Sequence, residues 1–145
     1  MSDINVESDE EEPPMPKRAL NHPDLPSPPG FSRGVEVSGP GRTIYLAGAA
    51  PLDDQNQLVG PGDVAAQADA SMGKLAGVIK AAGGSMSDVV YLNLYMKDIS
   101  QIGEIQAVRD KYLQGPVYPA MSGIQTPLAH PDWLIEIDGV AFIED

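Results

Sequence analysis

Glu136 and Asp138, near the end of the chain, have a spacing that can place two carboxylates side by side. They alternate with Ile135 and Ile137, so a β-strand at this point directs both acids to one face. On a central strand, such a carboxylate is positioned to act as a general acid or base. On an edge strand the same two acids would face solvent, and the spacing alone leaves both interpretations open.

Other common catalytic chemistries are excluded or disfavoured by composition. The 145-residue chain contains no cysteine, which excludes disulfides, thiolate zinc sites and cysteine nucleophiles. His22 and His130 lie far apart, and beyond the first residues no Asp/Glu cluster has the spacing of a metal-binding loop. We therefore expect no metal site. A Ser–His–Asp triad is also disfavoured, because His130 lies between Ala129 and Pro131 without a neighbouring nucleophile motif.

The charge limits the partners of the protein. With 21 acidic and 9 basic side chains, the chain has a formal net charge of −12. Nucleic-acid affinity comes largely from Lys and Arg that neutralise phosphates, so nucleic acids and anionic membranes are disfavoured as partners. No apolar run approaches the roughly 18 residues needed to span a bilayer, and the acidic N-terminus is unlike a signal peptide. We expect a cytoplasmic location.

The sequence divides into a tail and one domain. Residues 1–30 are acidic and hold seven of the 14 prolines, a composition that buries too little apolar surface to fold. We interpret residues 1–30 as a disordered tail and residues 31–145 as a single folded domain.

Strand and helix patterns alternate through this domain. Residues 35–37 and 43–48 predict two strands joined by a Gly/Pro turn, which indicates a hairpin. Asp63 predicts the start of a long helix, with apolar residues three and four positions apart. The alternation in residues 87–97 predicts a strand.

A second helix is predicted from Ser100 to Gly115-Pro116, and two final strands near residues 117–126 and 133–142. The order is therefore ββαβαββ, an α+β sandwich with two helices on one face of a mixed sheet. The other face carries tyrosines and an asparagine of residues 91–95. We expect self-association to cover this half-apolar face.

Several short motifs, in this order and spacing, resemble the RidA/YjgF family of reactive-intermediate (enamine/imine) deaminases. The resemblance extends from about residue 29 to residue 142. The matching segments are Gly62-Asp63-Val64-Ala65-Ala66-Gln67-Ala68, Ala81-Ala82-Gly83, Met86-Ser87-Asp88-Val89-Val90, Tyr95-Met96-Lys97-Asp98, Tyr118-Pro119-Ala120 and Leu134-Ile135-Glu136-Ile137-Asp138-Gly139-Val140-Ala141.

The resemblance implies a homotrimer with a chorismate-mutase-like α+β fold and ligand clefts between adjacent subunits. Active members hydrolyse enamines and imines formed from amino acids, releasing ammonia without a metal or cofactor. The family glutamate that positions or activates water matches Glu136. The aromatic residue that opens the first strand matches Phe31, the small pair on the cleft floor matches Ala47-Gly48, and the polar helix residue matches Gln106.

The chain departs from the family at the carboxylate-binding arginine. That arginine follows Pro-Ala, where this chain has Met121, and the next cleft position, often cysteine, is Gly123. A thioether cannot make the bidentate charged hydrogen bonds that hold a carboxylate. Arg33 lies two residues after Phe31 and would replace the arginine if the strand is regular. Alternatively, Met121 simply fills a cleft that has lost its original substrate.

Two functional hypotheses follow. The first is a RidA-like enzyme that hydrolyses or rearranges a neutral or apolar imine, enamine or related small reactive intermediate. Glu136 would move protons, and Phe31, Tyr95 and Met121 would form an apolar pocket. Met121 then predicts weak hydrolysis of imines derived from simple amino acids, which Met121→Arg should increase.

The second hypothesis is a non-enzymatic trimer that binds a small molecule or a protein. Loss of the arginine favours it, whereas a carboxylate such as Glu136 in an apolar cleft favours the enzyme. Ribonuclease activity, sometimes attributed to this family, is disfavoured by the net charge of −12.

Overall fold

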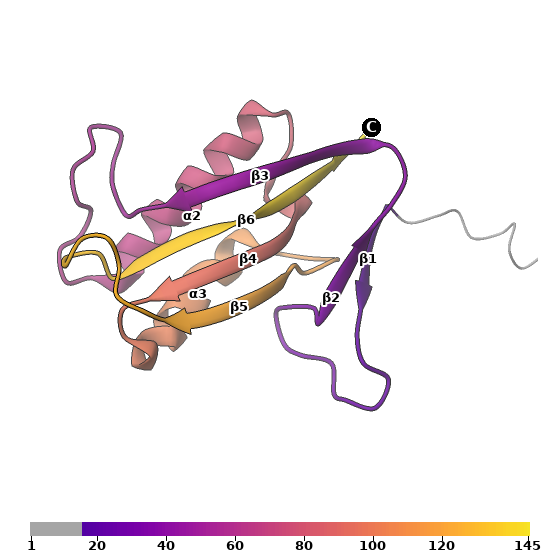
Figure 1. Cartoon of the computed structure of the whole chain (residues 1–145), viewed down its shortest axis with the longest axis horizontal. Helices are drawn as coiled ribbons and strands as arrows, with labels where there is room; N and C mark the ends of the chain where they lie inside the picture. The colour runs from indigo at the N-terminus through magenta and orange to yellow at the C-terminus, as the bar shows by residue number, and fades with distance from the viewer. Residues whose placement is uncertain (1–15) are drawn as a thin grey trace, which may run out of the picture.

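The computed structural model describes residues 16–145 as a four-stranded mixed sheet with two helices on one face and a separate two-stranded hairpin (Figure 1). The larger sheet has the order β3-β6-β4-β5, in which β4 and β5 are parallel and the other pairs antiparallel. The predicted α+β class is therefore confirmed. The elements are β1 (Lys17–Leu20), β2 (Gly34–Val37), β3 (Gly41–Ala49), α2 (Val64–Ala81), η1 (Met86–Asp88), β4 (Val89–Met96), η2 (Ile99–Gln101), α3 (Ile102–Tyr112), β5 (Ala120–Gln125) and β6 (Ile135–Glu144).

Helix α2 begins and packs as its sequence predicts. The side chain of Asp63 accepts a hydrogen bond from the Ala66 amide at 3.1 Å, which caps the first turn. The apolar residues of one face, among them Met72 and Ile79, are fully buried against the sheet. Gly83 follows the helix and has a φ of +90°, a backbone conformation that suits glycine.

The strand predicted in residues 87–97 is β4, and its alternation sorts side chains between two faces. Leu92, Leu94 and Met96 are buried under the helices. Tyr95 is paired directly opposite Glu136 of β6 on the other face, which neither helix covers (Figure 1). β6 lies between β3 and β4, so it is a central strand.

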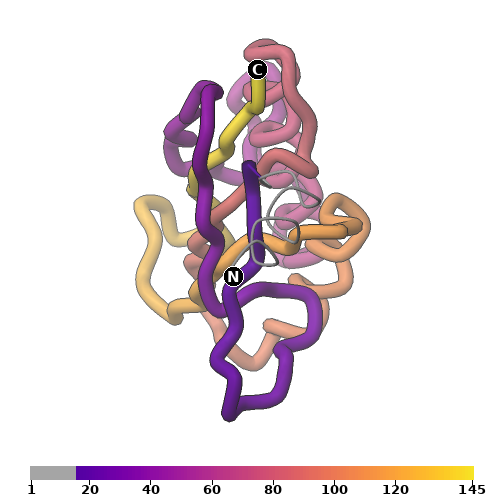
Figure 2. Tube along the Cα trace, turned by 90° about the vertical axis from the view of Figure 1, so that its right-hand side faces the viewer, coloured from indigo at the N-terminus to yellow at the C-terminus, as the bar shows by residue number. Residues whose placement is uncertain are grey.

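The N-terminal strands differ from the expectation. Residues 17–20, expected to be part of a disordered tail, form β1, and β2 pairs with β1 rather than with β3. The Lys17 ammonium fixes this segment to the domain through Asp88 (2.7 Å) and the Phe142 carbonyl (3.2 Å). The loop joining β1 to β2 projects from the rest of the fold (Figure 2). Residues 1–15 of the predicted tail lie outside the described residues.

Gln67 connects α2 to the beginning of β6. Its fully buried amide donates to the Gly60 and Asp132 carbonyls at 3.3 and 3.2 Å and accepts from the Leu134 amide at 2.7 Å. A buried amide satisfied on both sides fixes the segment that leads into Glu136. In residues 16–145, no helix is long and apolar enough to cross a membrane.

Candidate active site

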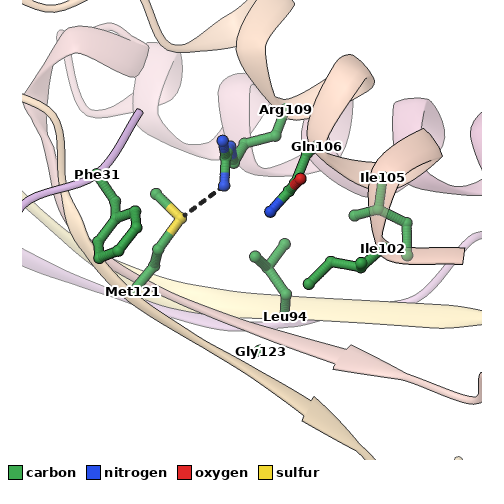
Figure 3. Close-up of a pocket in the computed structure, with 8 residues that line it drawn as sticks. All are labelled: Phe31, Leu94, Ile102, Ile105, Gln106, Arg109, Met121 and Gly123. Atoms are coloured by element: carbon green, nitrogen blue, oxygen red, sulfur yellow. Dashed lines mark hydrogen bonds between the residues drawn. The ribbon is translucent and has the colours of Figure 1, made fainter. Parts of the chain in front are cut away.

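A cavity of about 170 Å³ lies between helix α3 and strand β5, on the helix-covered side of the sheet (Figure 3). A cavity of roughly this size holds a benzene-sized molecule. Four residues expected at the ligand site, Phe31, Gln106, Met121 and Gly123, line it together. The other lining residues are Leu94, Ile102, Ile105 and Arg109.

Phe31 reaches the cavity because its neighbour is anchored to the segment before β5. The buried hydroxyl of Ser32 donates to the Tyr118 carbonyl at 2.6 Å, and the Ser32 amide donates to the Pro119 carbonyl at 3.0 Å. Ser32 also forms an isolated parallel bridge with Ala120. These bonds place the Phe31 ring opposite Met121 (Figure 3).

Met121 and Gly123 project from the same face of β5, two residues apart. A side chain at Gly123 would approach the Met96 methyl to 3.0 Å, so glycine keeps this end of the cavity open. Gln106 extends toward the cavity from α3 (Figure 3). Strand and helix thus form its two opposing walls.

Arg109 is the lining residue that the sequence analysis missed. Its guanidinium is nearly fully buried and extends from α3 to Met121, where Nη1 lies 3.3 Å from the thioether sulfur (Figure 3). Arg109 follows Gln106 by three residues, a separation that places two side chains on one helical face. That spacing was the available signal. Met121 predicted an apolar pocket, but the guanidinium of Arg109 adds a positive charge to the cavity wall.

Arg33 is not brought into this cavity within the chain. Its side chain is exposed and donates to the Pro26 carbonyl at 3.3 Å, while its amide donates to the Asn21 side chain at 3.2 Å. These contacts belong to the loop between β1 and β2.

Glu136 lies on the uncovered face, close to Gly48 of β3. A Cβ atom at Gly48 would overlap Glu136 Oε2 and lie 3.0 Å from its Cδ, so the carboxylate rests directly on the glycine backbone. None of the side-chain hydrogen bonds between described residues involves Glu136. Both carboxylate oxygens are thus available to water or to a ligand.

Asp138, on the same face, has a different environment. It accepts hydrogen bonds from the Asn93 amide at 2.8 Å and from the Tyr95 hydroxyl at 3.2 Å. Burial, together with the negative charge of Asp138, raises the pKa of Tyr95, so its hydroxyl stays a donor at neutral pH. Asp138 and Tyr95 therefore stabilise the sheet face beside Glu136, and Tyr95 does not line the cavity.

Ala47 and Gly48 border a second hollow, at the β3 edge against α2. Tyr45 and Val78 border it as well, with 82% and 53% of their surface exposed. One chain therefore carries two groups of candidate residues, one beside edge strand β3 and one beside edge strand β5. Within a single chain they do not form one site. Residues 16–145 contain no group of three or more His, Asp or Glu side chains arranged to hold a metal ion.

Comparison with known proteins identifies relatives across most of the chain. The model of a family described as endoribonuclease L-PSP matches residues 25–143. The 3-aminoacrylate deaminase RutC of Acinetobacter baylyi is 32% identical over 131 residues, which are 89% of this chain and 100% of the relative.

Solved structures give the same relationship. A protein of unknown function from Yersinia pestis, YyfB of the conserved Rid family, has 34% identity and a TM-score of 0.76, covering 88% of this chain and 98% of its own. Rv2704 of Mycobacterium tuberculosis, from the YjgF/YER057c/UK114 family, has 28% identity and a TM-score of 0.61, covering 79% and 88%.

Proposed function

We propose a function from one established premise: the chain belongs to the endoribonuclease L-PSP family, also called the RidA/YjgF family. We infer that it is an imine/enamine deaminase-like enzyme acting on a small reactive intermediate. The single observation that carries this proposal is the position of Glu136, a carboxylate without a hydrogen-bond partner among the described residues, resting on Gly48. A binding scaffold has no need of such a group.

The reaction requires a proton acceptor and a proton donor in sequence. Glu136 accepts a proton from water as the water oxygen adds to the carbon of the protonated imine, giving a neutral carbinolamine. Glu136 then returns this proton to the nitrogen, the C–N bond breaks with ammonia as the leaving group, and Glu136 accepts the hydroxyl proton as the carbonyl forms. An enamine first takes a proton at carbon and so becomes the imine.

The complete site requires two chains. The cavity at the β5 edge holds Phe31, Gln106 and Met121, whereas Glu136 and Gly48 lie near the β3 edge of the other sheet face. We propose that the β5 edge of one chain meets the β3 edge of the next. Contacts between unlike edges close into a ring when the rotation between neighbours allows it, and the family resemblance favours three members.

We therefore expect a homotrimer in solution. Light scattering should give a mass about three times the 15.3 kDa of one chain. A monodisperse monomer at micromolar concentration would contradict both the shared site and the assembly.

The walls of the cavity determine which imines are accepted. Phe31, Leu94 and Met121 are apolar, so we propose that the substrate carries a short apolar side chain. Met121 in place of the family arginine would alter specificity in this way. An imine formed from an amino acid carries one carboxylate on its α-carbon. A further carboxylate in its side chain would have to lose its bound water beside apolar atoms, which disfavours such a substrate.

An assay with two imines tests the function. Imines generated in situ from alanine and from aspartate should both be offered, with ammonia release as the measurement. We expect the alanine imine to be hydrolysed at least about tenfold faster, because burying an unpaired carboxylate costs more than the roughly 1.4 kcal/mol that corresponds to a factor of ten. Equal rates would contradict the altered specificity. No acceleration of either imine would contradict a substrate that carries a carboxylate, and would favour either the non-enzymatic scaffold or an enzyme for a neutral imine.

Ribonuclease activity is not part of the proposal. With a net charge of −12, the chain repels a polyanion. The cavity contains one positive side chain and, at about 170 Å³, is too small for a whole nucleotide.

A further inference from the structure

We propose that Arg109 of helix α3 binds the carboxylate of the substrate, the role that relatives are expected to give to the residue at position 121. This inference rests on the proposed function, because it assigns a substrate class to the same site. Arg109 lies on helix α3, whereas position 121 lies on strand β5, on the opposite wall of the cavity.

The charge distribution of the cavity supports this role. Among its eight lining residues, Arg109 is the one charged side chain, and only 6% of the residue is exposed. Water screens a buried charge less than an exposed one, so a ligand anion is attracted more strongly here than at the surface. In a chain of net charge −12, such a local positive group is what gives a small anion a place to bind.

The present partners of the guanidinium leave it incompletely paired. Nε and Nη2 both contact a single oxygen of Asp110, at 3.0 and 2.9 Å, and the Asp110 side chain is 58% exposed. Solvent therefore weakens this ion pair. The Nη1 group donates to the sulfur of Met121, which is a weak acceptor.

A carboxylate oxygen is a better partner for Nη1 than the sulfur is. Charge-assisted N–H···O bonds are shorter and stronger than neutral ones. The methionine side chain is unbranched and flexible, so it can withdraw and let a ligand oxygen replace the sulfur. Met121 then contacts the apolar part of the ligand.

The loop that carries Phe31 leaves space for this arginine. Gly30 has a φ of +74°, which side chains rarely adopt, and a Cβ there would lie 2.8 Å from Arg109 Nη2. Glycine at position 30 allows both the turn and the close approach of the guanidinium. The arginine is therefore integrated into the wall of the cavity and is not a surface side chain lying over its entrance.

Binding of a carboxylate and of its neutral analogue to the full chain tests the inference. Pyruvate and pyruvamide have the same shape but differ in charge, and calorimetry can measure both. For Arg109→Gln we expect pyruvate affinity to fall about 10- to 150-fold, as for the loss of a hydrogen bond to a charged group. Pyruvamide affinity should change less than about threefold. Arg109→Lys should be intermediate, since it keeps the charge without the planar fork.

Two arginine variants provide the comparison. Arg18→Gln removes an exposed charge of the β1–β2 hairpin, paired with Glu36 at 2.9 Å, and should leave both affinities unchanged. Arg33→Gln tests the other candidate. If Arg33→Gln weakens pyruvate binding and Arg109→Gln does not, the inference is wrong.

A crystal of the wild-type protein with pyruvate decides the matter if Arg109→Gln fails to fold. The carboxylate should lie within hydrogen-bond distance of Arg109 Nη1, and a carboxylate held elsewhere would overturn the proposal. Binding is measured separately from turnover. Pyruvate binding that depends on Arg109, without imine hydrolysis, would support this inference and reject the proposed function. If the protein hydrolyses imines but Arg109→Gln leaves pyruvate binding unchanged, the proposed function is supported and this inference is wrong.

Discussion

Glu136→Gln should lower the rate of imine hydrolysis by about 10²–10⁴-fold, the contribution typical of a positioned acid or base. Glutamine keeps the shape of the side chain but cannot accept the proton of the attacking water. Because Glu136 makes no hydrogen bond to another described side chain, the substitution should leave folding and assembly intact. Steady-state kinetics measured alongside light scattering would test both expectations.

Asp138→Asn is the matched control for this experiment. It replaces a second carboxylate of the same strand and face, but one that is held by Asn93 and Tyr95. We expect a loss of stability and less than about a tenfold loss of activity, because this carboxylate is occupied by structural hydrogen bonds. If Asp138→Asn were the more damaging variant and Glu136→Gln retained full turnover, the proton-transfer role would belong to Asp138.

The sequence predicts the elements of this fold better than their pairing. The Asp63 cap and the alternation within residues 87–97 are local signals. Helix α2 begins directly after Asp63, and β4 (Val89–Met96) lies within the expected strand, with a register shift between Val89 and Tyr91. The turn after Val37 shows that the chain reverses, but not which strand pairs with β2. That partner is β1. Lys17 of β1 is held by Asp88, which lies 71 residues away in the sequence, so no local pattern could predict the pairing.

The candidate site was also predictable only in part, because its residues come together through contacts between segments far apart in the sequence. Family resemblance identified Phe31, Gln106, Met121 and Gly123, which meet at one cavity. None of the motifs that carry the resemblance includes Arg109, so its place in the cavity needed the structure. Helical spacing from Gln106 gives its face, but only the packing of α3 against β5 shows that its guanidinium lies against Met121.

Gly48→Ala should reduce imine hydrolysis by about 10²-fold, the loss that a displacement of about 1 Å in a catalytic group can produce. The added methyl group would overlap the Glu136 carboxylate and push it from its position. This effect should require Glu136. In a Glu136→Gln background, adding Gly48→Ala should lower the rate of hydrolysis by less than about threefold, because residues that act through one group do not have additive effects.

Gly77→Ala is the control for adding a methyl group. A Cβ at Gly77 meets nothing within 4 Å, so the variant should keep full activity and gain about 0.5–1 kcal/mol of stability from helix propensity. Equal activity of Gly48→Ala and Gly77→Ala would mean that the working carboxylate does not rest on Gly48. The assembled site would then have to hold Glu136 in a different rotamer, turned away from β3. Glu136 would then not be presented at the β3 edge to the cavity of the neighbouring chain.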